Sequence, residues 1–290
     1  MPRIAIIGGG SIGEALLSGL LRAGRQTKDM VVAEKDPTRA KYLAETYSVR
    51  MTSVLDAAEN AAYVIVAVKP GDVQSVIGEI ADAAANAEND SVEQVVVTVA
   101  AGISTAVYEA KLPAGAPVVR VMPNAPMVVG GGVSALAAGR FATAAQLDEV
   151  RAIFHTVGGV LTVPESQLDA VTALSGSGPA YFFLMVEALV DAGVDAGLPR
   201  PVATDLVSQT MAGSAAMLLE RLDGASPAGS PAMGAGIDTS PAALRATVTS
   251  PGGTTAAGLR ELERGGFRAT VANAVAAAKT RSEQLGITPE

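Results

Sequence analysis

The chain has 290 residues, of which 49% are hydrophobic and 17% are charged, which is enough apolar material for the cores of two ordinary domains. Its formal net charge of −8 argues against nucleic acid or an anionic membrane surface as a partner. Cysteine is absent and His155 is the single histidine, so disulfides and thiolate catalysis are excluded and no metal site is expected.

The chain has no stretch of about 18 uninterrupted apolar residues, so we expect no membrane span. It opens with Met1-Pro2-Arg3 and passes directly into a strand-like run, which leaves no room for a signal peptide. These features predict a cytoplasmic protein.

The first 163 residues alternate short apolar runs with helical patterns. The predicted strands are Arg3–Gly8, Met30–Ala33, Ser48–Met51, Tyr63–Val68, Val95–Val99 and Val118–Met122, with Val133–Ala137 and Gly159–Val163 completing the sheet. The predicted helices between them are Ser11–Ala23, Pro37–Thr46, Asp56–Asn60 and Val73–Ala85. This alternation predicts a doubly wound, mostly parallel sheet with helices on both faces, a Rossmann-like α/β domain over residues 1–163.

The pattern after Pro164 is helical throughout. The predicted helices are Leu168–Thr172, Ala180–Ala192, Arg200–Arg221, Ala242–Val248, Thr254–Arg264 and Phe267–Leu285. We therefore expect an all-helical second domain over residues 164–290. Within it, residues 223–239 are rich in glycine, alanine, serine and proline, which predicts a mobile loop.

The run Gly8-Gly9-Gly10-Ser11-Ile12-Gly13 fits the pattern G-x-G-x-x-G between a predicted strand and a predicted helix. Gly8 allows the tight turn, Gly10 lets a pyrophosphate approach the backbone, and Gly13 lets the helix pack close to the strand. The helix N-terminus supplies N–H donors, so Gly8, Gly10, Ser11, Ile12 and Gly13 are expected to bind NAD(P). A glycine-rich turn without a ligand is the alternative.

Glu34 and Lys35 end the second strand and give conflicting signals about the cofactor. An acidic residue about 20 positions beyond the glycine turn typically accepts hydrogen bonds from a free ribose and favours NAD. Lys35 could instead pair with a 2′-phosphate and favour NADP. The sequence leaves NADH and NADPH both open, and a solvated charge pair is the third interpretation.

Ligands of open α/β sheets bind along the carboxyl ends of the strands. Two further predicted strands end in segments that are expected to contact the cofactor there, Ala67-Val68-Lys69-Pro70 and Val99-Ala100-Ala101. Their small residues would let the cofactor lie flat, and Lys69 could reach a ribose or a phosphate. A solvent-facing loop lysine is the alternative for Lys69.

The distribution of proton donors favours an imine over a ketone as substrate. Ketone reduction usually needs a lysine, histidine or tyrosine to move a proton, but no lysine occurs between Lys111 and Lys279. His155 is expected to be structural, and Tyr181 is expected to pack beside Phe182 and Phe183. An imine nitrogen is basic and can arrive protonated, so reduction of a C=N bond requires less from the protein.

Two motifs stand out in the helical half. Ser175-Gly176-Ser177-Gly178-Pro179-Ala180-Tyr181 precedes a long apolar helix, and a plain interhelix turn is its alternative interpretation. Ser250-Pro251-Gly252-Gly253-Thr254-Thr255 opens another helix, whose free N–H groups and hydroxyls would suit a small anionic ligand. A helix cap without a ligand is the alternative there.

These two motifs, together with Val121-Met122-Pro123-Asn124, resemble the Δ1-pyrroline-5-carboxylate reductase family along essentially the whole chain. The resemblance implies that NAD(P)H reduces the cyclic imine pyrroline-5-carboxylate to L-proline, the last step of proline biosynthesis. It also implies homodimers joined through the helical domain, which in relatives often assemble into larger rings such as decamers.

The resemblance assigns roles to individual residues. Ser250, Gly253, Thr254 and Thr255 would hold the substrate carboxylate and ring, and Thr255 would act catalytically by assisting protonation of the imine nitrogen. Asn124 would join the cofactor-contacting residues.

Three departures from the family pattern bear on these roles. Val54 stands near a position where relatives commonly carry a cofactor-contacting asparagine, and Glu34-Lys35 replaces residues suited to a 2′-phosphate. Residues 223–239 are longer than the expected connection, so Asp238 is aligned only loosely with an acidic residue near the substrate in some relatives.

Two other functions remain to be weighed against the reductase. A β-hydroxyacid-type dehydrogenase has the same domain order but predicts a catalytic lysine in the helical domain. A non-catalytic NAD(P)-sensing scaffold predicts cofactor binding without turnover.

Overall fold

The computed structural model describes residues 2–59, 61–86, 93–223 and 240–287. By compactness the chain forms two units, Met1–Pro179 together with Val275–Glu290, and Ala180–Ala274. The predicted loop 223–239 lies outside the described residues except for Asp223, which ends a helix.

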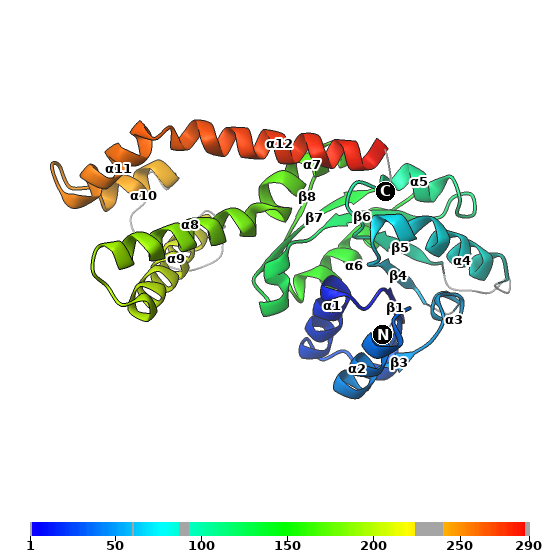
Figure 1. The fold of residues 1–290 in the computed structure, drawn as a ribbon. Coiled ribbons are helices and arrows are strands. Elements are labelled where there is room, and N and C mark those ends of the chain that lie inside the picture. Colours follow the sequence, from blue (N-terminus) through cyan, green and yellow to red (C-terminus); the bar gives the residue numbers. More distant parts are fainter. Residues whose placement is uncertain (1, 60, 87–92, 224–239, 288–290) are drawn as a thin grey trace. The chain divides into compact units, whose positions relative to one another are not determined.

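The first unit is built on an eight-stranded sheet of order β3-β2-β1-β4-β5-β6-β7-β8 (Figure 1). The strands are β1 (Ile4–Ile7), β2 (Met30–Ala33), β3 (Arg50–Met51), β4 (Tyr63–Val66), β5 (Val95–Thr98), β6 (Val118–Met122), β7 (Gly132–Ala138) and β8 (Gly158–Thr162). The first six strands are parallel, whereas β7 runs antiparallel to β6 and β8 parallel to β7. The prediction of a mostly parallel sheet is therefore confirmed.

Helices cover both faces of this sheet (Figure 1). They are α1 (Ser11–Arg22), α2 (Pro37–Tyr47), α3 (Val54–Ala58), α4 (Val73–Asn86), α5 (Thr105–Glu109) and α6 (Ala144–His155). Alternate strand residues enter two separate cores: Ile4 and Ile6 pack with α1, α2 and α6, whereas Ala5 and Ile7 pack with α3, α4 and α5. The central strands β1, β2 and β4 are continuously apolar because they are buried on both faces.

Helices α5 and α6 are additional to the predicted elements. Helix α5 has only five residues, too few to show a helical period. Helix α6 begins at a capping box, in which the hydroxyl of Thr143 accepts the Gln146 N–H and the Gln146 side chain accepts the Thr143 N–H. A threonine followed three residues later by glutamine was the sequence signal for this helix.

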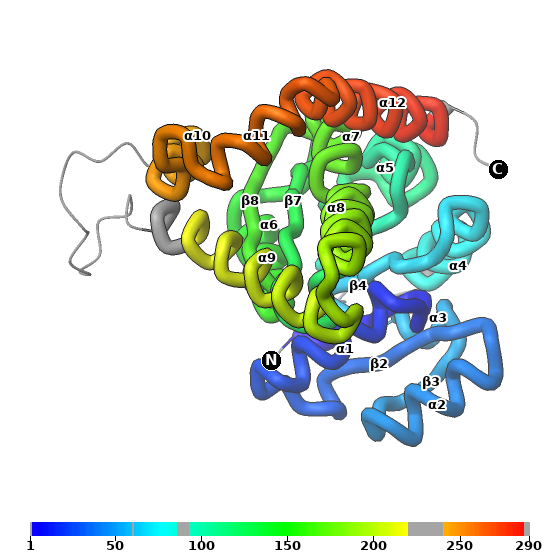
Figure 2. Tube along the Cα trace, turned by 60° about the vertical axis from the view of Figure 1, so that its left-hand side comes forward, coloured from blue at the N-terminus to red at the C-terminus, as the bar shows by residue number. Residues whose placement is uncertain are grey.

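The second unit is helical. It contains most of α8 (Gly178–Asp195), then α9 (Arg200–Asp223), α10 (Pro241–Thr247), α11 (Thr254–Arg264) and the start of α12 (Phe267–Ile287). Helices α8 and α9 lie side by side (Figures 1 and 2), and a Cβ added at Gly193 would lie 3.1 Å from the Cβ of Ala203. No strand follows β8 within the described ranges, as the sequence pattern predicts.

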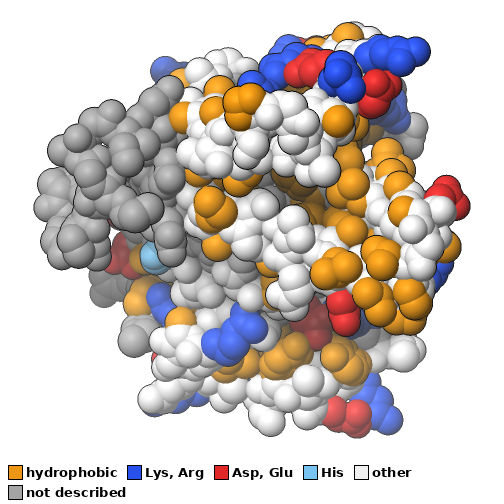
Figure 3. All heavy atoms as spheres, turned by 90° about the vertical axis from the view of Figure 1, so that its left-hand side faces the viewer, with side chains coloured by type: hydrophobic (Ala, Val, Ile, Leu, Met, Phe, Trp, Pro, Cys, Tyr) orange, Lys and Arg blue, Asp and Glu red, His pale blue; other side chains and the backbone are white. Residues whose placement is uncertain are grey.

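Apolar side chains remain exposed on this helical unit (Figure 3). Phe182, Phe183 and Leu184 of α8 are each more than 60% exposed, and α9 adds Leu206 and Leu219 at 54% and 61%. By length and composition alone, the stretch Glu165–Asp195 could cross a membrane, since an 18-residue window within it has a mean hydropathy of 1.3. The expectation of no membrane span rested on uninterrupted apolar runs, and acidic residues interrupt this stretch.

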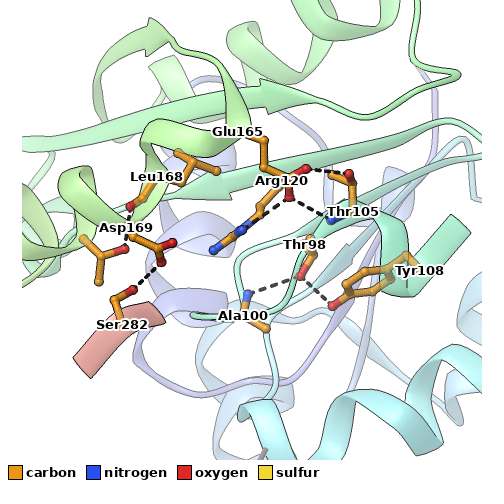
Figure 4. A network of polar contacts seen from close by, with 10 residues as sticks. Thr98, Ala100, Thr105, Tyr108, Arg120, Glu165, Leu168, Asp169 and Ser282 are labelled. Carbon is orange, nitrogen blue, oxygen red and sulfur yellow. Dashed lines mark hydrogen bonds and ion pairs between the residues drawn. The ribbon is translucent and has the colours of Figure 1, made fainter. Parts of the chain in front are cut away.

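The short helix α7 (Leu168–Val171) and the π-helix Thr172–Gly176 belong to the first unit. Polar contacts of Glu165, just before α7, and of Asp169, within it, connect this segment to the rest of that unit (Figure 4). Glu165 accepts the Thr105 N–H and O–H at 2.8 and 2.7 Å and pairs with the buried Arg120 at 3.3 Å. The Ser282 hydroxyl, in the last part of α12, donates to Asp169 at 2.6 Å. Residues before α8 and after Ala274 thus belong physically to the sheet unit.

Truncation of Glu165 should destabilise the fold. Arg120, with 8% of its side chain exposed, would lose its carboxylate partner, and the two Thr105 donors would lose theirs. We expect Glu165→Ala to lower the free energy of unfolding by on the order of 2–4 kcal/mol, measured by denaturant titration at fixed protein concentration. The matched control is Asp148→Ala, which removes an exposed ion pair with Arg151. Equal losses in both variants would contradict this assignment.

Candidate functional site

The carboxyl ends of four parallel strands meet at one edge of the sheet. Beyond the paired strand residues, the Gly8 N–H donates to Ala33 O at 2.8 Å and the Ala67 N–H donates to Ile7 O at 2.7 Å. The Val99 N–H continues the ladder to Val66 O at 3.0 Å. The four segments that are predicted to contact the cofactor therefore begin at the same level of the sheet. They follow β1, β2, β4 and β5.

The glycine turn has the geometry that a pyrophosphate site requires. Gly8 has φ +102°, and an added Cβ would lie 2.6 Å from the backbone oxygen of Ala67. A Cβ on Gly13 would lie 2.0 Å from Gly8 O, whereas one on Gly10 would meet no atom within 4 Å. Gly10 is also the N-cap of α1 and offers no side-chain acceptor to the first turn. The first turn of α1 is therefore left without a side-chain cap, which leaves its backbone N–H groups available to an anion.

A cleft of about 480 Å³ adjoins this turn, within the size range of small-molecule sites. The predicted cofactor residues that line it are Gly8, Gly10, Glu34, Lys35, Ala67, Val68 and Lys69. The predicted residues outside its lining are Ser11, Ile12, Gly13, Pro70, Val99, Ala100, Ala101 and Asn124. The cleft has room for the adenosine part of a dinucleotide.

Sequence reasoning missed part of this lining. Thr52 and Ser53 follow β3, next to Val54, the position that the resemblance had marked for a cofactor contact and that begins α3 inside the cleft. Asp72, Ser75, Val76 and Glu79 also line it. Ser75, Val76 and Glu79 follow Asp72 by three, four and seven residues, which is the spacing of one face of a helix. The predicted helix Val73–Ala85 could therefore have indicated which of its residues face the cleft.

Glu34 and Lys35 are held in different ways. The Glu34 carboxylate lies in the cleft and accepts the Gly9 N–H at 2.7 Å and the Asp36 N–H at 2.8 Å. The Lys35 ammonium donates to both Asp72 oxygens at 2.8 Å, although 78% of the lysine side chain is exposed. The carboxylate is therefore fixed by the backbone, and the ammonium is neutralised by a surface ion pair.

A second polar cluster lies at the start of α1. The Arg39 guanidinium donates to Gly9 O at 2.7 Å and pairs with Glu14, whose other oxygen accepts the Tyr47 hydroxyl at 2.8 Å. Burial acts to raise the pKa of Glu14, but the hydrogen bonds from Arg39 and Tyr47 outweigh it and leave that pKa below its usual value. Glu14 is thus ionised at neutral pH. Burial, followed by the bond to Glu14, raises the pKa of Tyr47.

Asn124 and His155 make structural contacts. The Asn124 side chain accepts the Val133 N–H at 2.8 Å and donates to the carbonyl and hydroxyl oxygens of Ser175, both at 3.3 Å. It thereby connects the end of β6 to the π-helix within the motif that begins at Ser175. The His155 ring lies 3.1 Å from Gly158 O at the end of α6, the structural role that the sequence predicted.

The motif Ser250–Thr255 forms a tight turn at the start of α11. The Gly253 N–H donates to Ser250 O at 3.1 Å, and Gly252 has φ +70°. Gly253 is the N-cap of α11 and provides no side-chain acceptor. The side chains of Thr254 and Thr255 are exposed, and neither hydroxyl has a hydrogen-bond partner among the described residues. The turn presents N–H and O–H donors together.

Comparison with known proteins gives matches along the whole chain. The family model for pyrroline-5-carboxylate reductase dimerisation matches residues 165–285, and a model described as NADP oxidoreductase, coenzyme F420-dependent, matches residues 3–102. A pyrroline-5-carboxylate reductase from Mycobacterium tuberculosis is 71% identical over 291 residues, covering 100% of this chain and 99% of that protein.

Solved structures agree with the sequence matches. A pyrroline-5-carboxylate reductase from Coxiella burnetii superimposes with a TM-score of 0.85 at 32% identity and covers 99% of each chain. The Plasmodium falciparum pyrroline carboxylate reductase, solved with NADP bound, gives a TM-score of 0.80 at 28% identity over 98% of each chain. The matches include both the glycine turn and the Ser250–Thr255 turn. The chain therefore belongs to the pyrroline-5-carboxylate reductase family.

Proposed function

We propose that this protein catalyses the reaction of its family, reduction of the C=N bond of 1-pyrroline-5-carboxylate to L-proline, in the cytoplasm. A bound NADH or NADPH supplies the hydride, which adds to the imine carbon while the nitrogen keeps its proton as an amine. We assign the dinucleotide to residues 1–163 and the substrate to residues 164–290. Family membership favours this reaction over a hydroxyacid dehydrogenase or a non-catalytic sensor.

The observation that carries the substrate assignment is the uncapped start of α11. Its first-turn N–H groups have no side-chain acceptor from Gly253, and a helix N-terminus favours a carboxylate. Ser250, Gly253 and Thr254 would then hold the substrate carboxylate and ring. The absence of lysine between Lys111 and Lys279 fits an imine, which arrives protonated and needs only to be oriented.

The exposed Thr255 hydroxyl has no hydrogen-bond partner among the described residues. Its oxygen can accept the N–H of the protonated imine, and its O–H can donate to the lone pair that forms on nitrogen during hydride transfer. We assign it the catalytic role of orienting the protonated imine and keeping a donor on the nitrogen as its positive charge disappears during hydride transfer. An interaction of this kind strengthens along the reaction, so it acts on kcat more than on KM.

Glu34 provides the basis for a choice between the two dinucleotides. Its fixed carboxylate lines the cleft, together with those of Asp72 and Glu79, whereas Lys35 is already paired with Asp72. A 2′-phosphate would add about two negative charges beside these carboxylates, whereas a ribose hydroxyl could donate to Glu34. We propose that the protein uses NADH in preference to NADPH.

The dimerisation match over residues 165–285 and the exposed apolar side chains of α8 and α9 support a homodimer through the helical unit. We further propose that dimers assemble into a ring such as a decamer.

The overall reaction is tested by mixing the purified protein with pyrroline-5-carboxylate and either reduced dinucleotide. We expect oxidation of the dinucleotide, followed by its absorbance, together with formation of proline. Absence of turnover with both dinucleotides would refute the proposed function.

Replacement of Thr255 separates its catalytic role from simple binding. We expect Thr255→Ala to lower kcat by up to the equivalent of about 2–4 kcal/mol, the cost of one preorganised donor, with a smaller rise in KM. Thr255→Ser keeps the hydroxyl and should retain most activity. The control is Thr270→Ala in α12, whose exposed hydroxyl donates to the O of Gly266, the residue before the helix, at 3.3 Å. A change confined to KM would contradict the assigned role of Thr255 during hydride transfer.

The cofactor preference is measured as the ratio of kcat/KM for NADH to that for NADPH. We expect this ratio to exceed one and Glu34→Gln to lower it about tenfold, because the amide carries no charge. Its single oxygen can keep the Gly9 N–H bond at the expense of the one to Asp36. Glu45→Gln, which alters an exposed ion pair with Lys41, is the control. A ratio that does not respond to Glu34→Gln would exclude this carboxylate as the determinant.

The assembly is tested by light scattering on the purified protein. A homodimer predicts twice the 29.1 kDa chain mass and a decamer ten times that mass. Separation of a decamer into even-numbered species on dilution would identify the dimer as its building block. A mass equal to one chain at all concentrations would contradict both states.

A further inference from the structure

Gly9, the middle residue of the glycine turn, is held through both of its backbone polar groups. Its N–H donates to Glu34 at 2.7 Å, and its carbonyl oxygen accepts the Nε of Arg39 at 2.7 Å. The Leu43 side chain packs against Gly9, since a Cβ added at Gly9 would lie 2.3 Å from Leu43 Cδ1. All three contacts come from the end of β2 and from α2, so this segment fixes the turn from outside.

Arg39 is itself fixed by a half-buried cluster. Its second contact is the ion pair with Glu14, in which 31% of the arginine side chain and 22% of the glutamate side chain are exposed. The Tyr42 ring lies 5.1 Å from the guanidinium carbon, and Tyr47 donates to the far oxygen of Glu14 at 2.8 Å. One planar guanidinium therefore joins the carbonyl of the turn to a carboxylate of α1, which a single ammonium would do poorly.

This cluster acts from behind the dinucleotide site. Gly8 and Gly10 line the cleft, but Gly9, Arg39 and Glu14 are not among its lining residues. Arg39 touches the turn only through the Gly9 carbonyl, between the two glycines that would meet the cofactor.

A turn with four glycines needs such restraint. Glycine loses more conformational freedom on ordering than any other residue, and at Gly10 even an added Cβ would meet no atom within 4 Å. If the turn were loose, binding of the pyrophosphate would have to order it at the expense of affinity. A turn already held in the folded protein binds without that cost.

We propose that Arg39, held by Glu14, is a positioning residue that preorganises the Gly8–Gly13 turn for the dinucleotide pyrophosphate. The inference rests on the dinucleotide site of the proposed function but not on the identity of the reduced substrate. Because the pyrophosphate is common to both cofactors, loss of Arg39 should weaken NADH and NADPH by the same factor.

The test measures dinucleotide dissociation constants by fluorescence titration without substrate. We expect Arg39→Met, which keeps an apolar stem over Tyr42, to raise Kd about tenfold for both NADH and NADPH. The value of kcat at saturating dinucleotide should change less than twofold. Arg39→Lys should show an intermediate Kd. Lys41→Met, on the same helix and in an exposed pair with Glu45, is the control and should leave Kd unchanged.

Each other outcome overturns the proposal in a distinct way. An unchanged Kd would show that the turn holds itself, and weakening of NADPH alone would make Arg39 a direct 2′-phosphate ligand. A lower melting temperature together with a lower kcat and a higher Kd would indicate a merely structural role for Arg39. The Glu14 oxygen that accepts the Tyr47 hydroxyl also accepts that of Tyr42, at 3.2 Å, and a glutamine keeps this acceptor. If the Arg39 variants fail to fold, Glu14→Gln must therefore still raise Kd for both cofactors.

The proposed function and the role of Arg39 can be refuted independently of each other. A protein that binds dinucleotide normally but does not reduce pyrroline-5-carboxylate would refute the reaction and leave the Arg39 measurement intact. Failure of the unaltered chain to bind either dinucleotide would overturn both.

Discussion

The pairing of β1 with β2 on one side and β4 on the other is the interaction on which the rest of the dinucleotide site depends. Its register places Ile7 level with both Ala33 and Val66, so the segments after the three strands leave the sheet together. Gly8 and Gly13 then allow the chain to reverse against Ala67 and return as α1, in space where a Cβ would collide with backbone. Substitution at either glycine would displace the turn from the sheet edge.

The electrostatics of the cleft follow from that geometry. Glu34 comes within 2.7 Å of the Gly9 N–H because β2 ends level with β1, and the same carboxylate thereby faces the place of a ribose. One acidic side chain thus combines restraint of the turn with a negative charge in the cleft. Lys35, one residue later, is directed to Asp72. In the proposed cofactor site, this short segment would therefore affect both the affinity for the dinucleotide and the choice between NADH and NADPH.

The helical unit is incomplete as a single chain. Its long helices expose phenylalanine and leucine side chains that an isolated domain would bury, and the matching family model is one of dimerisation. Dimer formation and stability of this unit are therefore linked.

The sequence by itself determined the sheet, the glycine turn, the helical second half and the family, because each is encoded by local patterns of apolar residues or by short motifs. Only the tertiary structure decided which partners the charged side chains around the glycine turn bind. Glu34 and Lys35 are adjacent in sequence, yet one bonds to Gly9 and the other to Asp72. Arg39 and Glu14, which no motif marks, meet because α2 packs beside α1. Contacts between elements depend on packing and register, which local patterns do not specify.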